Sequence, residues 1–444
     1  MAGAILSIVS FFLFFSATFA ASILPPSQDP WYEQPSNISD YAAGEMIRSR
    51  SVPPQLDSFA ALSANVSVKA VYQYLFRTTD GLGDAVASAV TLLEPYDSDP
   101  SKLVGYQAFY DSANVDCSPS YTLQVGNDNL GSMSSGMNVS EDIPFVAAAL
   151  NLGWWVFTTD YEGLKAEFSA GLQSGQAVLD STRVILDQGP SVGLSANPRY
   201  ALWGYSGGAL ASTWAAELQS SYAPELNYAG VAVGGTTPNI TSVLQTINKG
   251  SHTGLAFSGI YGQSKAFPNL TDWLDATLIP SKSAEFYSIA SGCLSQAAAM
   301  GSDQDFYTYF KDGEESFYED VPRSIFEWSG QMGLHGTPIA PMFVYKSTGD
   351  EVSPVEDTDA LVKKYCAAGA RIEYNRDLIG NHETEAITGS ASALQWISDR
   401  LSGKPVSDKC STRNVLLSSL SDGALALLGE ELFAILRTAL DELL

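Results

Sequence analysis

The segment YALWGYSGGALASTWAAEL, residues 200–218, carries the strongest indication of the fold. It joins a short strand pattern at Tyr200–Trp203 to an alanine-rich helical pattern at Ala209–Leu218. Between them lies Gly204-Tyr205-Ser206-Gly207-Gly208, which fits G-x-S-x-G, a strained strand-to-helix turn that exposes a nucleophilic serine. We therefore expect Ser206 to be a nucleophile.

A second match to the same pattern, Gly189-Pro190-Ser191-Val192-Gly193, begins 15 residues before Gly204. It follows a helical pattern instead of a strand, has a proline beside the serine, and is not followed at once by a helix. The context favours Ser206, and we expect Ser191 to belong to a loop.

Strand and helix patterns alternate on both sides of this segment. Short runs rich in β-branched and aromatic residues predict strands, and longer apolar periodicities predict helices. The strands are expected at 70–76, 85–93, 103–110, 154–159, 231–233, 341–345 and 372–374, and helices at 176–186 and 393–401. Such alternation predicts an α/β fold with a mostly parallel sheet covered on both faces. With the serine turn, it indicates the α/β-hydrolase fold, with a core at 69–235 and 338–411.

Three further regions depart from this alternation. Residues 21–68 form an N-terminal arm with little periodicity. Residues 236–337 carry irregular helical patterns rich in Ala, Ser and aromatic side chains, which predict an inserted helical cap or lid, or else a separate domain. Residues 412–444 alternate leucines with charges, which predicts an amphipathic C-terminal helical tail. We expect this tail either to shield the acyl site together with the cap or to cover a sheet edge.

A serine nucleophile needs a base, and the chain has three histidines to supply it. His252 and His335 lie within or at the edge of the expected cap. His382 lies on a loop between the last core strand and the last core helix, where this fold places its base. We expect His382 to be the base.

The acid that orients the base should lie between these two residues in the chain and just past a strand. Asp350 meets both conditions, since it follows the strand expected at 341–345. Glu351, Asp357 and Asp359 are the nearby alternatives, and we expect them to be solvated charges.

Backbone N–H groups must also meet the oxyanion that forms during acyl transfer. The residue after the nucleophile, Gly207, supplies one. The second is expected on the loop that begins Asp111-Ser112, chosen by its position after the strand at 103–110.

The N-terminus and the cysteines indicate export. Residues 1–20 resemble a signal peptide, and the apolar run is short for a membrane anchor, which is the alternative. Four cysteines in an exported chain favour two disulfides over a zinc site, since no C-x-x-C pair is present; their pairing is left open by the spacing. Glycosylation sequons occur at Asn37, Asn65, Asn138, Asn239 and Asn269.

The composition narrows the class of partner. Hydrophobic residues make up 45% and charged residues 16%, as in a folded globular protein. A net charge of −26 argues against nucleic acid as a partner and against electrostatic docking on an anionic membrane. Beyond the leader no stretch is long and apolar enough to predict stable membrane insertion. No oligomeric state is predicted.

From Leu24-Pro25-Pro26-Ser27-Gln28-Asp29-Pro30 to about Cys410, the chain resembles the fungal secretory lipase family. The resemblance rests on five motifs: Tyr110-Asp111-Ser112, Asp116-Cys117-Ser118-Pro119-Ser120-Tyr121, Trp203-Gly204-Tyr205-Ser206-Gly207-Gly208-Ala209, Gly349-Asp350 and Gly380-Asn381-His382. It implies a triacylglycerol lipase with a helical lid and a triad of Ser206, Asp350 and His382. It also implies an oxyanion hole of Asp111 and Gly207, and disulfides Cys117–Cys293 and Cys366–Cys410. The tail after Cys410 is longer than the family's usual end.

The expected activity is therefore hydrolysis of acylglycerol esters outside the cell, at an oil–water interface, through an acyl-enzyme. This chemistry needs no metal or organic cofactor. A general carboxylesterase or acyltransferase would use the same triad and is the first alternative. A serine peptidase and a non-catalytic hydrolase-like binding protein are further alternatives.

Overall fold

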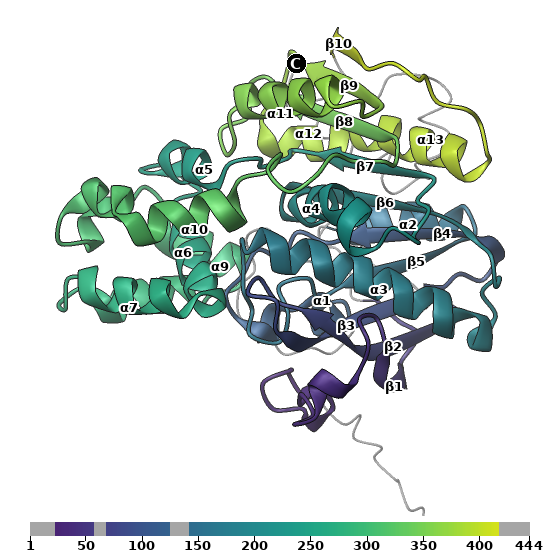
Figure 1. The fold of residues 1–444 in the computed structure, drawn as a ribbon, viewed down its shortest axis with the longest axis horizontal. Helices are drawn as coiled ribbons and strands as arrows, with labels where there is room; N and C mark the ends of the chain where they lie inside the picture. Colours follow the sequence, from purple (N-terminus) through teal and green to yellow (C-terminus); the bar gives the residue numbers. More distant parts are fainter. Residues whose placement is uncertain (1–22, 57–67, 125–141, 417–444) are drawn as a thin grey trace, which may run out of the picture.

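The computed structural model describes residues 23–56, 68–124 and 142–416. Within these ranges one sheet runs in the order β1-β2-β3-β5-β4-β6-β7-β8-β9-β10 (Figure 1). β1, β2, β3 and β5 pair antiparallel, and every pair from β5 through β4 to β10 is parallel. The strands are β1 (Met46–Val52), β2 (Ala70–Thr79), β3 (Ala85–Glu94), β4 (Asp99–Gln107), β5 (Trp154–Thr159), β6 (Arg199–Tyr205), β7 (Gly230–Gly234), β8 (Met342–Ser347), β9 (Ile372–Asp377) and β10 (Ser411–Val415).

Helices cover both faces of this sheet, which confirms the expected α/β class (Figure 1). α3 (Gly171–Val192) and α4 (Ser206–Tyr222) lie side by side, and Trp214 of α4 packs so closely on Gly175 of α3 that a Cβ there would overlap it. The other core helices are α1 (Pro119–Thr122), α2 (Ile143–Asn151), α11 (Val355–Ala367), α12 (His382–Thr388) and α13 (Ser390–Leu401). The interior strands are almost wholly buried, as continuous apolar runs require.

Residues 236–337, here called the cap, connect β7 to β8 and lie beyond one end of the sheet (Figure 1). They form α5 (Ile240–Ile247), α6 (Gly254–Ala266), α7 (Pro268–Thr277), α8 (Ser283–Ala290), α9 (Leu294–Gly301) and α10 (Asp320–Gly330). The cap helices share an apolar cluster of their own, in which Phe257, Phe286, Phe306, Phe310 and Phe317 pack against one another. The cap is therefore a packed helical unit rather than a long loop.

Both edges of the sheet differ from the sequence-based expectation. The arm contributes β1, whose MIRSRSV sequence is half-exposed and too polar to predict a strand. Thr412–Val415, expected to begin the helical tail, instead belong to β10, a polar edge strand parallel to β9. Edge strands bury little side-chain area and so carry weak hydrophobic patterns. Residues 417–444, the rest of the expected tail, lie outside the described residues.

Two smaller differences concern element ends. β4 stops at Gln107, so residues 108–110, expected to be strand, start the loop that leads to Asp111. Ser191 lies in the last turn of α3 and not in a loop, because α3 continues through Pro190 to a left-handed Gly193.

The cysteines form two disulfides, in the pairing that the family resemblance implies. Cys117–Cys293 joins the loop region after β4 to the cap, and Cys366–Cys410 joins α11 to the residue just before β10. Both bridges close large loops, of 176 and 44 residues, so they restrict the unfolded chain strongly.

Among the described ranges, no helix is long and apolar enough to cross a membrane. The signal peptide expected at 1–20 and the sequons Asn65 and Asn138 lie outside those ranges. Asn37 and Asn269 are exposed, whereas Asn239 is half-buried and caps α5 by accepting from the N–H groups of Thr241 and Ser242. Glycosylation stays a prediction for all five.

Candidate functional site

The serine turn predicted from the sequence lies between β6 and α4. Ser206 is the first residue of α4 and has a φ of 48°, a left-handed conformation that is strained for a residue with a side chain. Gly208 lets α4 approach β4, since a Cβ there would overlap the carbonyl oxygen of Gln107. This turn holds the Ser206 hydroxyl, which is partly exposed, at the carboxyl end of the parallel strands.

His382 reaches this hydroxyl from the start of α12. Its Nε2 lies 2.9 Å from Ser206 Oγ, and its Nδ1 lies 2.7 Å from Asp350 Oδ2. The main chain of His382 is also held in place. Its N–H donates to Glu351 (2.9 Å), and its carbonyl accepts from the Tyr205 hydroxyl (2.6 Å). Three residues that are far apart in the chain therefore form one continuous hydrogen-bonded line.

Asp350 follows β8 and is held on both carboxylate oxygens. Oδ1 accepts from the N–H groups of Val352 (2.9 Å) and Ser353 (2.8 Å), and Oδ2 accepts from His382 and from the Lys346 ammonium (2.8 Å). Burial alone would raise the pKa of Asp350, but His382 and Lys346 outweigh it and hold the pKa well below its usual range. Asp350 is therefore a carboxylate at any pH near neutrality.

Asp111 and Gly207, the residues expected around the oxyanion, lie against each other. Asp111 is buried, has a φ of 36°, and places Oδ1 where a Cβ on Gly207 would overlap it. Oδ1 has no hydrogen-bond partner within the described part of the chain. Burial raises the pKa of Asp111 to about 7, so its carboxyl is neutral in weakly acidic solution.

The other two histidines make different contacts. His252 Nε2 lies 3.4 Å from Glu383 Oε1, and His335 Nε2 lies 2.8 Å from the carbonyl oxygen of Trp328. Neither replaces His382 at Ser206, whose hydroxyl lies 2.9 Å from Nε2 of the His382 ring.

The structure gives the alternative acids and the alternative serine contacts other than the His382 ring. Glu351 accepts from the His382 backbone, and Asp359 accepts from the Tyr374 hydroxyl and pairs with Arg376. Asp357 lies in the first turn of α11, and Ser191 Oγ donates to the carbonyl of Gln188 in α3.

Two parts of the site were missed by the sequence analysis. Lys346 had a signal that was not used, since a lysine within the buried β8 run MFVYKS requires a charged partner. Phe168 and Ser169, which precede α3 and line the cavity described next, carry no pattern that distinguishes them from other loop residues.

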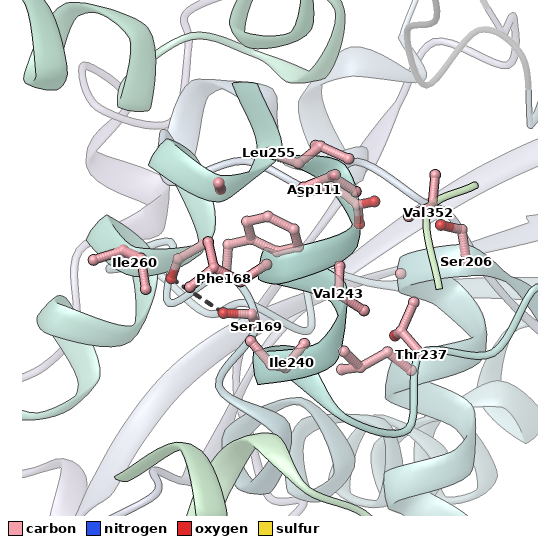
Figure 2. Close-up of a pocket in the computed structure, with 16 residues that line it drawn as sticks. Asp111, Phe168, Ser169, Ser206, Thr237, Ile240, Val243, Leu255, Ile260 and Val352 are labelled. Atoms are coloured by element: carbon pink, nitrogen blue, oxygen red, sulfur yellow. Dashed lines mark hydrogen bonds between the residues drawn. The ribbon is translucent and has the colours of Figure 1, made fainter. Parts of the chain in front are cut away.

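An apolar cavity of about 550 Å³, including space open to solvent, begins at Ser206. Figure 2 shows Ser206 and Thr237 at one end of this cavity and Ile260 toward the other, with Phe168 and Val243 between them. Much of the lining comes from α5 and α6 of the cap: Ile240, Val243, Leu244, Ile247, Leu255, Ala256, Gly259 and Ile260. The cap therefore supplies a hydrophobic wall directly beside the serine hydroxyl.

Known proteins resemble this chain over almost its whole length. Lipase A of Arthroderma benhamiae is 37% identical over 92% of this chain and 86% of its own length. The trichothecene C-3 esterase of Fusarium sporotrichioides is 36% identical over 88% of each chain. The X-ray structure of Candida antarctica lipase A in its closed state superposes with a TM-score of 0.81 at 30% identity, covering 94% of this chain and 96% of that one.

The fold, together with these relatives, defines a lipid ester hydrolase with the α/β-hydrolase fold. The family model described as "Secretory lipase" matches residues 129–409. The chain belongs to the secretory lipase family, as its motifs predicted.

Proposed function

We propose that this protein is a secreted triacylglycerol lipase that uses Ser206, His382 and Asp350 as its catalytic triad. The observation that carries the proposal is the hydrogen-bonded line from Asp350 through His382 to Ser206, which ends at the mouth of an apolar cavity. A nucleophile, a base and an orienting acid beside an apolar cavity meet the geometric requirements of ester hydrolysis.

In this mechanism neutral His382 takes the proton of Ser206 through Nε2 as the hydroxyl oxygen attacks the ester carbonyl. Asp350 holds the proton on Nδ1 and stabilises the imidazolium that forms. The C–O bond of the tetrahedral intermediate then breaks, and His382 gives its proton to the leaving alcohol. Water repeats the two steps and releases the fatty acid from the acyl-serine.

Gly207 and Asp111 are proposed to stabilise the oxyanion. The residue after the nucleophile presents its backbone N–H at the start of α4, where the helix dipole also favours negative charge. A neutral Asp111 carboxyl beside Gly207 can add a donor, whereas its carboxylate would repel the oxyanion.

We therefore expect kcat/KM to fall as the pH rises through about 7, the pKa of Asp111. Burial raises this pKa, so the neutral donor is present below pH 7 and is lost above it, with a limiting slope of about tenfold per pH unit. Asp111→Asn cannot ionise and should remove this alkaline decline. The measurement is the pH profile of kcat/KM on a soluble short-chain ester. Asp272→Asn, which alters an exposed cap carboxylate, is the control; an alkaline decline that persists in Asp111→Asn would contradict the role of Asp111.

The cap is proposed to act as a lid that binds the acyl chain and shields it from water. Each buried methylene contributes about 0.8 kcal/mol, so an apolar wall along the chain selects long acyl groups. The proposal is supported by the residues of α5 and α6 that line the cavity beside Ser206.

The position of Gly259 on α6 allows this role to be tested by filling the cavity. A Cβ at Gly259 would meet Ser169 Oγ at 3.6 Å and Phe168 Cε1 at 3.8 Å, which are ordinary contacts, so alanine fits. We expect Gly259→Leu to lower kcat/KM roughly tenfold for long-chain esters and little for acetates, because it displaces about two methylenes. The assay compares a chain-length series for Gly259→Leu, Gly259→Ala and the unmodified chain. An equal loss on all lengths would mean that α6 only supports the fold.

An esterase acting on a non-glyceride alcohol is the second candidate function. The observation that favours it is the relative named as a trichothecene C-3 esterase, which is as similar to this chain as the lipases are. The same triad would serve both activities. Hydrolysis of emulsified triolein, compared with soluble esters of bulky alcohols, separates them.

Secretion is inferred from the expected signal peptide, the sequons and the family to which the chain belongs. A fluorophosphonate probe added to culture medium and to washed cells tests location and chemistry together. We expect the labelled chain in the medium, with the label on Ser206. Label on another residue would contradict the triad, and label confined to the cells would contradict secretion.

A further inference from the structure

Lys346 is a buried cation beside the proposed catalytic acid. It lies on β8, its side chain is fully buried, and its ammonium contacts Asp350 Oδ2 at 2.8 Å. The same ammonium donates to the carbonyl of Thr236 at 3.0 Å, where β7 gives way to the cap. Burying a lysine is costly unless it is paired, so this contact is a specific feature of the site.

Asp350 Oδ2 is shared between this ammonium and the imidazole. His382 Nδ1 lies 2.7 Å from Oδ2 and Lys346 Nζ lies 2.8 Å from it, so the two nitrogens are near neighbours. A positive charge at that distance opposes a second positive charge on the ring. The imidazolium that forms during catalysis is therefore stabilised less than it would be by Asp350 alone.

The other titratable groups described around Lys346 and His382 are carboxyl groups and one further histidine, His252. Asp357 of α11 and Glu385 of α12 face Lys346, and burial lowers the pKa of Lys346 while these carboxyls and Asp350 oppose that effect. Glu351 contacts the backbone of His382, and Glu383 follows it and pairs with His252. Burial raises the pKa of Glu385 well above its ordinary value, so Glu385 offsets the Lys346 charge little. Among these described groups, Lys346 places a positive charge directly on Asp350 Oδ2.

We propose that Lys346 is a positioning residue that fixes the Asp350 carboxylate and extends the activity of the His382 base to lower pH. The inference rests on the proposed triad. Lys346 does not contact the Ser206 hydroxyl; it acts on His382 through its contact with Asp350 and through the repulsion between the two positive charges.

The test is the pH profile of kcat/KM on a soluble short-chain ester for Lys346→Met and Lys346→Arg. Lys346→Met removes the charge but keeps an unbranched side chain, and we expect the acid limb to move up by about one to two pH units. At pH 5 this corresponds to a loss of roughly ten- to a hundredfold, with a much smaller loss near neutrality. Lys346→Arg keeps the charge, so its acid limb should stay within a few tenths of a unit.

A purely structural role for Lys346 predicts a different result. It would lower kcat/KM by the same factor at every pH, leaving the acid limb in place, and that result would overturn the proposal. The Thr236 carbonyl also accepts from Ser353 Oγ (3.2 Å) and Thr358 Oγ1 (3.4 Å), so it keeps partners in either variant. If Lys346→Met does not fold, Lys346→Gln replaces it, and the same shift of the acid limb is required.

The proposal and the triad on which it rests can fail separately. If His382→Gln retains activity, the triad is wrong and the inference about Lys346 falls with it. If His382→Gln is inactive and the acid limb of Lys346→Met is unshifted, the triad stands and only the role of Lys346 is refuted. The protonation of His382 can also be followed directly by NMR of ¹³C-labelled histidine rings, since the chain has three histidines. The variants His252→Gln and His335→Gln identify the signals of the other two. The ring should gain its proton at higher pH in Lys346→Met.

Discussion

Ser206→Ala is expected to lower kcat about 10⁶-fold while the protein folds and is secreted normally. The substitution removes the only atom that can form the acyl-enzyme in the proposed mechanism. It adds no strain, since alanine meets the same restriction as serine at a φ of 48°. Turnover of a soluble ester, incorporation of a fluorophosphonate probe and the melting temperature are measured together.

Ser191→Ala is the matched control, because it alters the second G-x-S-x-G sequence. Ser191 Oγ donates to the Gln188 carbonyl near the exposed end of α3, away from the histidine line. It should keep full activity and full probe incorporation. If Ser206→Ala kept substantial activity and Ser191→Ala lost it, Ser191 would be the nucleophile and the assignment to Ser206 would be wrong.

The parts of the fold that were predictable are those with strong local patterns. The turn at Ser206 could be located because a buried strand, a G-x-S-x-G sequence and an alanine-rich helix follow one another directly. Buried parallel strands such as β5 and β7 are continuous apolar runs, and they were placed within a residue or two. Both edge strands, β1 and β10, were missed, because their exposed faces dilute the hydrophobic pattern.

The sequence predicted which residues lie together at the candidate site, but not how they are arranged there. Chain order and element type are local information, and they were enough to propose His382 and Asp350. The contact of Asp111 with Gly207 depends on the left-handed conformation of Asp111, which no residue pattern specifies. The cavity depends on how α5 and α6 pack over the serine, and this packing is tertiary information.

Lys346 lies between these cases. A lysine in a buried strand must have a charged or polar partner. The sequence therefore predicts that Lys346 has a partner, but not which residue it is. Asp350, Asp357 and Glu385 all face it, and the geometry selects Asp350 by an ammonium–carboxylate distance of 2.8 Å. The Lys346 charge also affects the stability of variants in which Asp350 is replaced.

Asp350→Asn is expected to lower kcat about 10⁴-fold, the second largest effect among our predictions. A neutral amide can donate to the ring, which favours the tautomer whose Nε2 already carries a proton and cannot accept one from Ser206. Because the amide carries no negative charge, it also cannot stabilise the His382 imidazolium that forms during catalysis. The change leaves the Lys346 ammonium buried without its carboxylate, so we also expect a loss of stability, on the order of 3–5 kcal/mol if the lysine stays charged.

The two consequences of Asp350→Asn can be separated with a double variant. Asp350→Asn combined with Lys346→Met removes the uncompensated charge, so it should recover much of the lost melting temperature without recovering turnover. Stability is followed by thermal unfolding and catalysis by kcat on a soluble ester. Recovery of turnover in the double variant would show that Asp350 serves mainly to neutralise Lys346. Loss of turnover that persists after stability is restored would place Asp350 in the proton-transfer line with His382 and Ser206.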